Sequence, residues 1–85
     1  MKVVAKPIEV IAWFGKDGKI NPIKFRIEQE EIKVIKIEKV LKREKEKLAG
    51  RYMEKFLCSS VVDGVEKLFE LKFDILSSQW ILFKI

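Results

Sequence analysis

The sequence predicts an all-β fold, a six-stranded antiparallel meander curled into a small barrel. Apolar and polar residues alternate over much of the chain, which is the period of a strand with one buried face. Two Asp-Gly dipeptides interrupt this alternation where tight turns between paired strands are expected. Because an open sheet leaves its edge strands unpaired, we expect the first and last strands to meet. At 85 residues the chain forms one domain, residues 1–85.

The first predicted hairpin joins residues 8–14 to residues 23–27 around Asp17-Gly18. A type I′ turn needs positive φ at both central residues and favours this dipeptide. The register that follows is self-consistent, because one face becomes apolar and the other sets opposite charges side by side. The predicted pairs are Val10 with Phe25, Ala12 with Ile23, Ile8 with Ile27, and Glu9 with Arg26.

The second predicted hairpin is centred on Asp63-Gly64 and follows the same logic. Its outer face sets Lys55 opposite Lys72, a like-charge contact that diagonal acidic residues can relieve. A three-residue connection, residues 76–78, then leads into the last strand. The expected pairs of this hairpin are Tyr52 with Ile75, Phe56 with Leu71, Cys58 with Phe69, and Leu57 with Glu70. Those of the last strand are Phe73 with Ile81, Leu71 with Phe83, Phe69 with Ile85, and Glu70 with Lys84.

The middle of the chain carries two patterns. Apolar residues from Ile32 to about Lys42 change parity between Val34 and Ile35, which predicts one long strand with a β-bulge. Residues 41–57 are rich in strong helix formers, so an α+β fold with one helix near residues 41–49 is the alternative. Gly50 lies within that segment and counts against a helix. We therefore predict strands, with residues 42–50 as an exposed connection.

Composition excludes most catalytic chemistry. The chain has no His, so Ser59, Ser60 and Cys58 lack an obvious general base. Structural zinc needs four ligands drawn mainly from Cys and His, and only one Cys is present. The glycines match no phosphate-binding loop. We therefore expect no enzymatic activity, no cofactor and no bound metal.

The cellular location is inferred from the same residues. Cys58 has no second cysteine for an internal disulfide, which favours a reducing compartment, and the cytoplasm is the default. The longest uncharged run covers residues 75–83, less than half of the ~20 apolar residues that a spanning helix requires. We expect a cytoplasmic protein without a membrane partner.

An apolar outer patch is the stronger of two candidate surfaces. In the predicted registers four large apolar side chains point away from the interior, and closure of the barrel sets them side by side. Trp is also a frequent hot-spot residue in interfaces. The alternative is that the Trp rings fold over a barrel end or lie under the central connection. The patch predicts a protein partner or a homodimer through Ile11, Trp13, Trp80 and Leu82.

A basic strand face is the second candidate surface. The chain has 18 basic and 13 acidic residues, a net charge of +5, and Lys supplies most of the excess. The outer face of the second and third strands is predicted to carry Lys24, Arg26, Lys33 and Lys36. That row suits weak, sequence-tolerant nucleic-acid binding, but it lacks aromatic residues for base stacking. We rank nucleic acid below a protein partner.

Several segments resemble a known group of proteins. IEVIAWF, PIKFRIE, KLAG, FLCSSVVDGVEKLFELKFD and WILFKI look like parts of short, uncharacterised proteins from low-GC Gram-positive bacteria. The resemblance covers nearly the whole chain, but its segments are structural. It implies an intracellular bacterial source and no activity, cofactor or binding residue.

Overall fold

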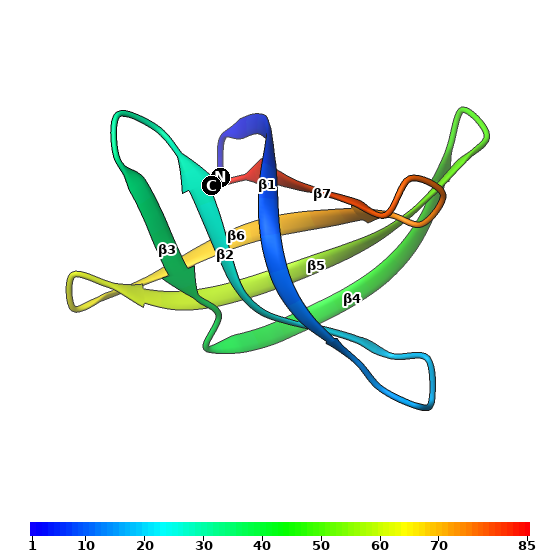
Figure 1. Ribbon diagram of the computed structural model, residues 1–85, viewed down its shortest axis with the longest axis horizontal. Coiled ribbons are helices and arrows are strands. Elements are labelled where there is room, and N and C mark those ends of the chain that lie inside the picture. The colour runs from blue at the N-terminus through cyan, green and yellow to red at the C-terminus, as the bar shows by residue number, and fades with distance from the viewer.

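The computed structural model describes residues 1–85 as seven strands without a helix (Figure 1). The all-β prediction is confirmed, with seven strands rather than six. The strands are β1 (Val3–Phe14), β2 (Ile20–Glu28), β3 (Ile32–Lys36), β4 (Lys39–Leu48), β5 (Arg51–Val62), β6 (Val65–Asp74) and β7 (Gln79–Lys84).

One antiparallel sheet contains all seven strands in the order β3-β2-β1-β7-β6-β5-β4. The first half of β1 pairs with β7 and its second half pairs with β2, so β1 belongs to both layers of the curled sheet. The predicted meeting of the first and last strands is therefore confirmed. Strands β3 and β4 remain as two edges, and the sheet forms a half-barrel (Figure 1).

The β1–β2 hairpin has the predicted register near its middle but a different turn. Val10 pairs with Phe25, as predicted. The Gly18 N–H donates to the Gly15 carbonyl at 2.9 Å and closes the turn. Of the two residues predicted at the centre of the turn, only Gly18 has a positive φ, at 87°. This loop is one residue longer than predicted. A bulge at Ile23 of β2 shifts the register by one residue in the opposite direction. The extra loop residue and the bulge therefore compensate for each other, and Val10 keeps its predicted partner.

Two predicted pairs of the same hairpin are wrong. Ala12 pairs with Pro22 instead of Ile23. Ile8 leaves β2 altogether and pairs with Trp80 of β7. The sequence reveals neither change, because the first depends on the extra loop residue and the second on where β1 passes from one layer to the other.

The β5–β6 hairpin matches its prediction. Asp63 and Gly64 both have positive φ, at 52° and 76°, as a type I′ turn requires. The predicted pairs from Lys55 to Cys58 are present. The repulsion between the Lys55 and Lys72 ammonium groups is relieved mainly by acidic residues of β4 rather than by the diagonal acidic residues of β6. Lys55 contacts Glu44 at 3.2 Å and Lys72 contacts Glu46 at 2.7 Å.

The predicted register of β7 is wrong by one residue near the turn. Phe73 pairs with Trp80, and Leu71 pairs with Leu82. Of the predicted pairs, only that of Glu70 with Lys84 forms, and it lies beyond a bulge. The connection has four residues, 75–78, because the Asp74 carboxylate accepts the Leu76 and Ser77 N–H groups at 3.0 and 3.2 Å. Because of these bonds, residue 75 belongs to the turn. The side chains at the start of β7 therefore point to the opposite faces from those predicted.

The single strand predicted for the middle is two strands, β3 and β4, and the helix alternative is wrong. The break lies at Ile37, whose N–H donates to the Ile23 carbonyl at 2.9 Å. The next N–H, of Glu38, donates to Ser59 at 2.8 Å, so the chain crosses from β2 to β5. The predicted bulge between Val34 and Ile35 is absent, because β3 pairs regularly with β2: Val34 is exposed on the outer face, and Ile35 pairs with the buried Phe25. A bulge occurs later, at Leu41 of β4. Residues 42–50 are not a connection, because β4 pairs with β5 to Leu48.

The core lies between the two layers of the half-barrel. Phe25 of β2 packs on Phe69 of β6 with ring centroids 5.2 Å apart. Phe56, Cys58 and Leu71 have no exposed surface. The remaining buried apolar residues are Ile20, Ile27, Ile37, Phe73, Trp80 and Leu82.

Candidate binding surfaces

The predicted apolar outer patch does not form as a four-residue surface. Ile11 and Trp13 lie on the outer face of β1 and are 58% and 69% exposed. Trp80 and Leu82 are 8% and 2% exposed and belong to the core, so their predicted outward orientation is wrong. The cause is the one-residue shift of β7, because a shift of one residue exchanges the faces of a strand.

An aromatic cleft opens where β1 leaves β7. The two strands stay paired up to Ile8 and Trp80 and then diverge, since β1 continues alongside β2. The space between them has a volume of about 700 Å³. We call it the aromatic cleft, and its apolar lining residues are Ile8, Val10, Phe14, Phe73, Trp80 and Ile81.

Aromatic rings line this cleft in a continuous series. Phe14 meets Phe73 edge-on at 6.1 Å, and Phe73 meets Trp80 at 4.8 Å. Trp80 in turn packs on Phe56 at 5.5 Å. Phe73 is buried by these contacts, whereas Phe14 at the end of β1 is 57% exposed. The cleft therefore has a fixed aromatic floor and one exposed aromatic wall.

The edge of β1 beside the cleft has no partner strand. Residues 9–14 pair with β2 on one side, and β7 pairs with β1 only up to Ile8. No backbone hydrogen bond outside the strand ladders involves residues 9–14. Alternate N–H and C=O groups of this segment therefore face the cleft without a partner from the chain, which is the arrangement that accepts an added strand.

Arg43 joins the edge strand β4 to β2 below the aromatic series. Its guanidinium donates to the Ile20 carbonyl and, at 2.9 Å, to Asn21 Oδ1. It also lies over the Phe56 ring, 5.5 Å from the centroid. Sequence reasoning missed both Arg43 and the cleft, because a lone Arg in a charged segment carries no signal of a contact with β2.

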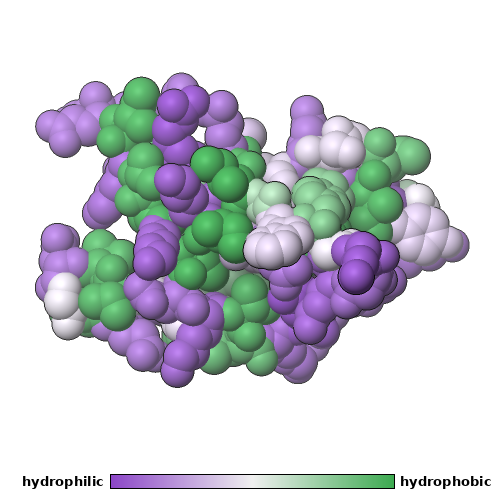
Figure 2. All heavy atoms as spheres, turned by 60° about the horizontal axis from the view of Figure 1, so that its bottom comes forward, coloured by the Kyte–Doolittle hydropathy of each residue, from purple (hydrophilic) through white to green (hydrophobic).

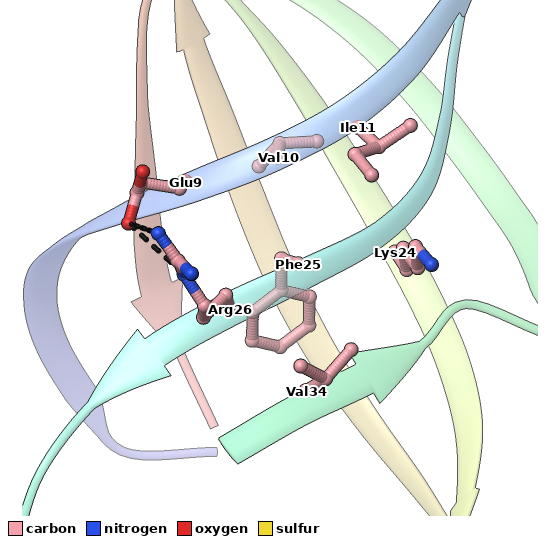
Figure 3. A pocket seen from close by; sticks show the side chains of 7 residues that line it. All are labelled: Glu9, Val10, Ile11, Lys24, Phe25, Arg26 and Val34. Atoms are coloured by element: carbon pink, nitrogen blue, oxygen red, sulfur yellow. Dashed lines mark hydrogen bonds and ion pairs between the residues drawn. The ribbon is translucent and has the colours of Figure 1, made fainter. Parts of the chain in front are cut away.

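The predicted basic row is shorter than expected. Lys24 and Lys36 are cross-strand neighbours on the outer face. Arg26 shares that face, but its guanidinium is bonded to Glu9 at 2.7 Å, and this hydrogen bond raises the pKa of Arg26 (Figure 3). Lys33 pairs with the buried Ile27 and so has the opposite orientation, which corrects its place in the row.

A shallow hollow lies on this outer face. Its volume is about 380 Å³, and Ile11 and Val34 border it with Lys24 and Arg26 between them (Figure 3). Figure 2 shows hydrophobic and hydrophilic side chains interspersed over one face of the molecule. The lining of the hollow is more polar than that of the aromatic cleft.

The structure places the nucleophilic side chain of Cys58 in the core. Cys58 is buried, and burial raises the pKa of its thiol to about 12, so it is a neutral thiol at pH 7. No three His, Cys, Asp or Glu side chains are placed to hold a metal ion. The fold has no helix with the length and apolar character needed to cross a membrane.

Comparison with protein families, curated proteins and solved structures finds no match to this chain.

Proposed function

We propose that the protein is a non-enzymatic interaction module that holds an extended segment of a partner protein in the aromatic cleft. The observation that carries this proposal is the unpaired edge of β1, residues 9–14, running beside aromatic walls. The unpaired, reduced Cys58 supports a cytoplasmic location for this module.

The bound segment pairs with β1 as an additional strand. Main-chain hydrogen bonds to residues 9–14 supply affinity that is independent of sequence. Every second side chain of the segment points into the cleft, between Phe14 and Trp80, so apolar residues at alternate positions are selected. Burial of one Leu-sized side chain there contributes about 1.5–3 kcal/mol.

Selection of extended peptides from a displayed random library tests this proposal. We expect the selected peptides to lose roughly tenfold or more of their affinity for a Phe14→Ser variant, because that change removes one wall of the cleft. Trp13→Ser is the matched control, since Trp13 is the adjacent residue, is similarly exposed and lies on the opposite face. Hydrogen exchange at residues 9–14 should slow when a peptide is bound.

The opposite pattern of losses would contradict the cleft. If Trp13→Ser abolishes binding and Phe14→Ser does not, the partner contacts the outer face around Ile11 and Trp13. A library that yields no binder at micromolar concentrations also counts against the proposal.

A second candidate function is weak binding of single-stranded nucleic acid through Lys24 and Lys36. The observation that favours it is the cross-strand pairing of these two lysines, neither of which forms an ion pair. Like charges in this position repel unless an anion lies between them. Trp13 is exposed on the same outer face and supplies one ring for stacking.

Filter binding at several salt concentrations tests the nucleic-acid function. With Lys24→Gln and Lys36→Gln together, we expect the slope of log affinity against log salt to fall by about 1.4, since each phosphate contact on a single strand contributes about 0.7. Lys33→Gln is the control, because Lys33 has the opposite orientation. An equal effect of Lys33→Gln, or no binding at low salt, rules this function out.

A further inference from the structure

Two neighbouring hairpin turns, β4–β5 and β6–β7, lie at one end of the molecule (Figure 1), and large apolar side chains are exposed there. Leu76 lies in the β6–β7 turn and is 84% exposed, the highest value among the large hydrophobic residues. Leu48 precedes the β4–β5 turn and is 69% exposed. Turns ordinarily carry Gly, Asn, Asp or Ser, so a leucine in the β6–β7 turn needs a reason. We call the set Leu48, Tyr52, Ile75 and Leu76 the leucine end.

The β6–β7 turn is held so that Leu76 stays exposed. The Asp74 side chain is buried and accepts the N–H groups of Leu76 and Ser77 at 3.0 and 3.2 Å. The Ser78 N–H closes the turn on the Asp74 carbonyl at 2.8 Å. These bonds fix the backbone of the turn, and Leu76 is presented to solvent instead of folding onto the core.

The two turns are tied together as one unit. Arg51, the cross-strand neighbour of Leu48, forms an ion pair with Asp74. The hydrogen bond with Arg51 also keeps the pKa of Asp74 below its ordinary value, so the pair is present at neutral pH. The Ile75 N–H donates to the Tyr52 carbonyl at 3.1 Å. These contacts join the two turns at the leucine end.

Basic side chains accompany these apolar ones. Lys45 and Lys47 lie on β4 at this end, and neither forms an ion pair. Lys47 lies over the Tyr52 ring at 5.1 Å from its centroid. The neighbouring acids Glu46 and Asp74 are paired with Lys72 and Arg51. Glu54 faces Lys45 across the strands without an ion pair. The free charge at the leucine end includes two lysines and one glutamate.

We infer that the leucine end inserts into the headgroup region of an anionic membrane surface. Protruding turns do not offer the roughly 800 Å² per partner that a stable protein interface buries, whereas a bilayer accepts single side chains. Leu enters the acyl boundary, Tyr suits the interface, and Lys is attracted to anionic lipid. The expectation of no membrane partner rested on the lack of a spanning segment and does not address such a surface contact.

Co-sedimentation with phosphatidylcholine vesicles that contain phosphatidylglycerol tests the inference. We expect the native chain to bind these vesicles at low salt, and Leu48→Ser with Leu76→Ser to weaken binding by roughly tenfold or more. The control is Val61→Ser with Val65→Ser beside the β5–β6 turn, where both valines are more than half exposed and Asp63 and Glu66 lie close by in sequence. That pair should change binding by less than about twofold.

Lysine variants provide a second arm that leaves the apolar side chains in place. Lys45→Gln with Lys47→Gln should weaken binding to the anionic vesicles by roughly thirtyfold, since each lysine near the surface contributes about 1 kcal/mol. It should not alter the weaker binding to pure phosphatidylcholine. Circular dichroism confirms that each variant is folded.

Three results would overturn the inference. The first is a native chain that stays in the supernatant with anionic vesicles at low salt. The second is an equal loss of binding in the Val61→Ser, Val65→Ser control. The third is sedimentation of the native chain as a dimer that Leu48→Ser with Leu76→Ser converts to a monomer, since the occupant of the leucine end is then a second copy.

Discussion

Replacement of Trp80 by alanine is expected to bring the protein close to unfolding. Trp80 is 8% exposed and packs on Phe73 and Phe56 at ring distances of 4.8 and 5.5 Å. Removal of a buried aromatic side chain of this size costs about 3–5 kcal/mol. The free energy of unfolding of a typical domain is only about 5–15 kcal/mol, and small domains lie at the low end.

Trp13→Ala provides the matched comparison, because Trp13 is the second of the two tryptophans and is 69% exposed. Its removal should change the free energy of unfolding by no more than about 0.5 kcal/mol, as is usual for surface positions. Urea titration followed by circular dichroism measures both values. Equal losses at the two positions would mean that β7 has the originally predicted register, with Trp80 on the outer face.

Replacement of Arg43 by alanine should have the second largest effect. The guanidinium bonds to the Ile20 carbonyl and to Asn21 and lies over Phe56. Hydrogen bonds from charged donors contribute about 1.5–3 kcal/mol, and the cation–π contact adds to this. We expect a loss of about 2–3 kcal/mol in the free energy of unfolding.

Two further variants separate the causes of this effect. Lys45→Ala changes a neighbouring exposed residue of β4 that has no ion pair, and should change the free energy of unfolding by no more than about 0.5 kcal/mol. Arg43→Lys keeps the charge but cannot reproduce the planar, forked donors, so it should recover less than half of the loss. Full recovery with lysine would show that charge alone joins β4 to β2.

Local signals were sufficient for the β5–β6 hairpin. Asp63-Gly64 specifies a turn with two positive φ values, and the apolar residues on both sides agree on one register. The register of β1 with β2 at Val10 and Phe25 was also predicted, but only because an error of one residue in the turn was cancelled by the bulge at Ile23.

Contacts between distant residues decided the candidate sites. The β6–β7 turn depends on Asp74, whose carboxylate is paired with Arg51 on another strand. Because that turn has four residues, Trp80 lies in the floor of the aromatic cleft and not in the predicted outer patch. In β4, strong helix formers adopt a strand because pairing with β5 supplies hydrogen bonds and cross-strand ion pairs that outweigh their propensity.

The sequence by itself determined the all-β class, the two hairpins whose loops contain Asp-Gly, and the pairing of the first strand with the last. These follow from residues close together in the chain and from the period of the apolar pattern. Only the tertiary structure decided where β1 leaves β7, which face Trp80 occupies and which strand edges stay open. Those features depend on one-residue shifts that are set by contacts between strands far apart in sequence, and such a shift reverses a whole face without altering the pattern that predicts the strand.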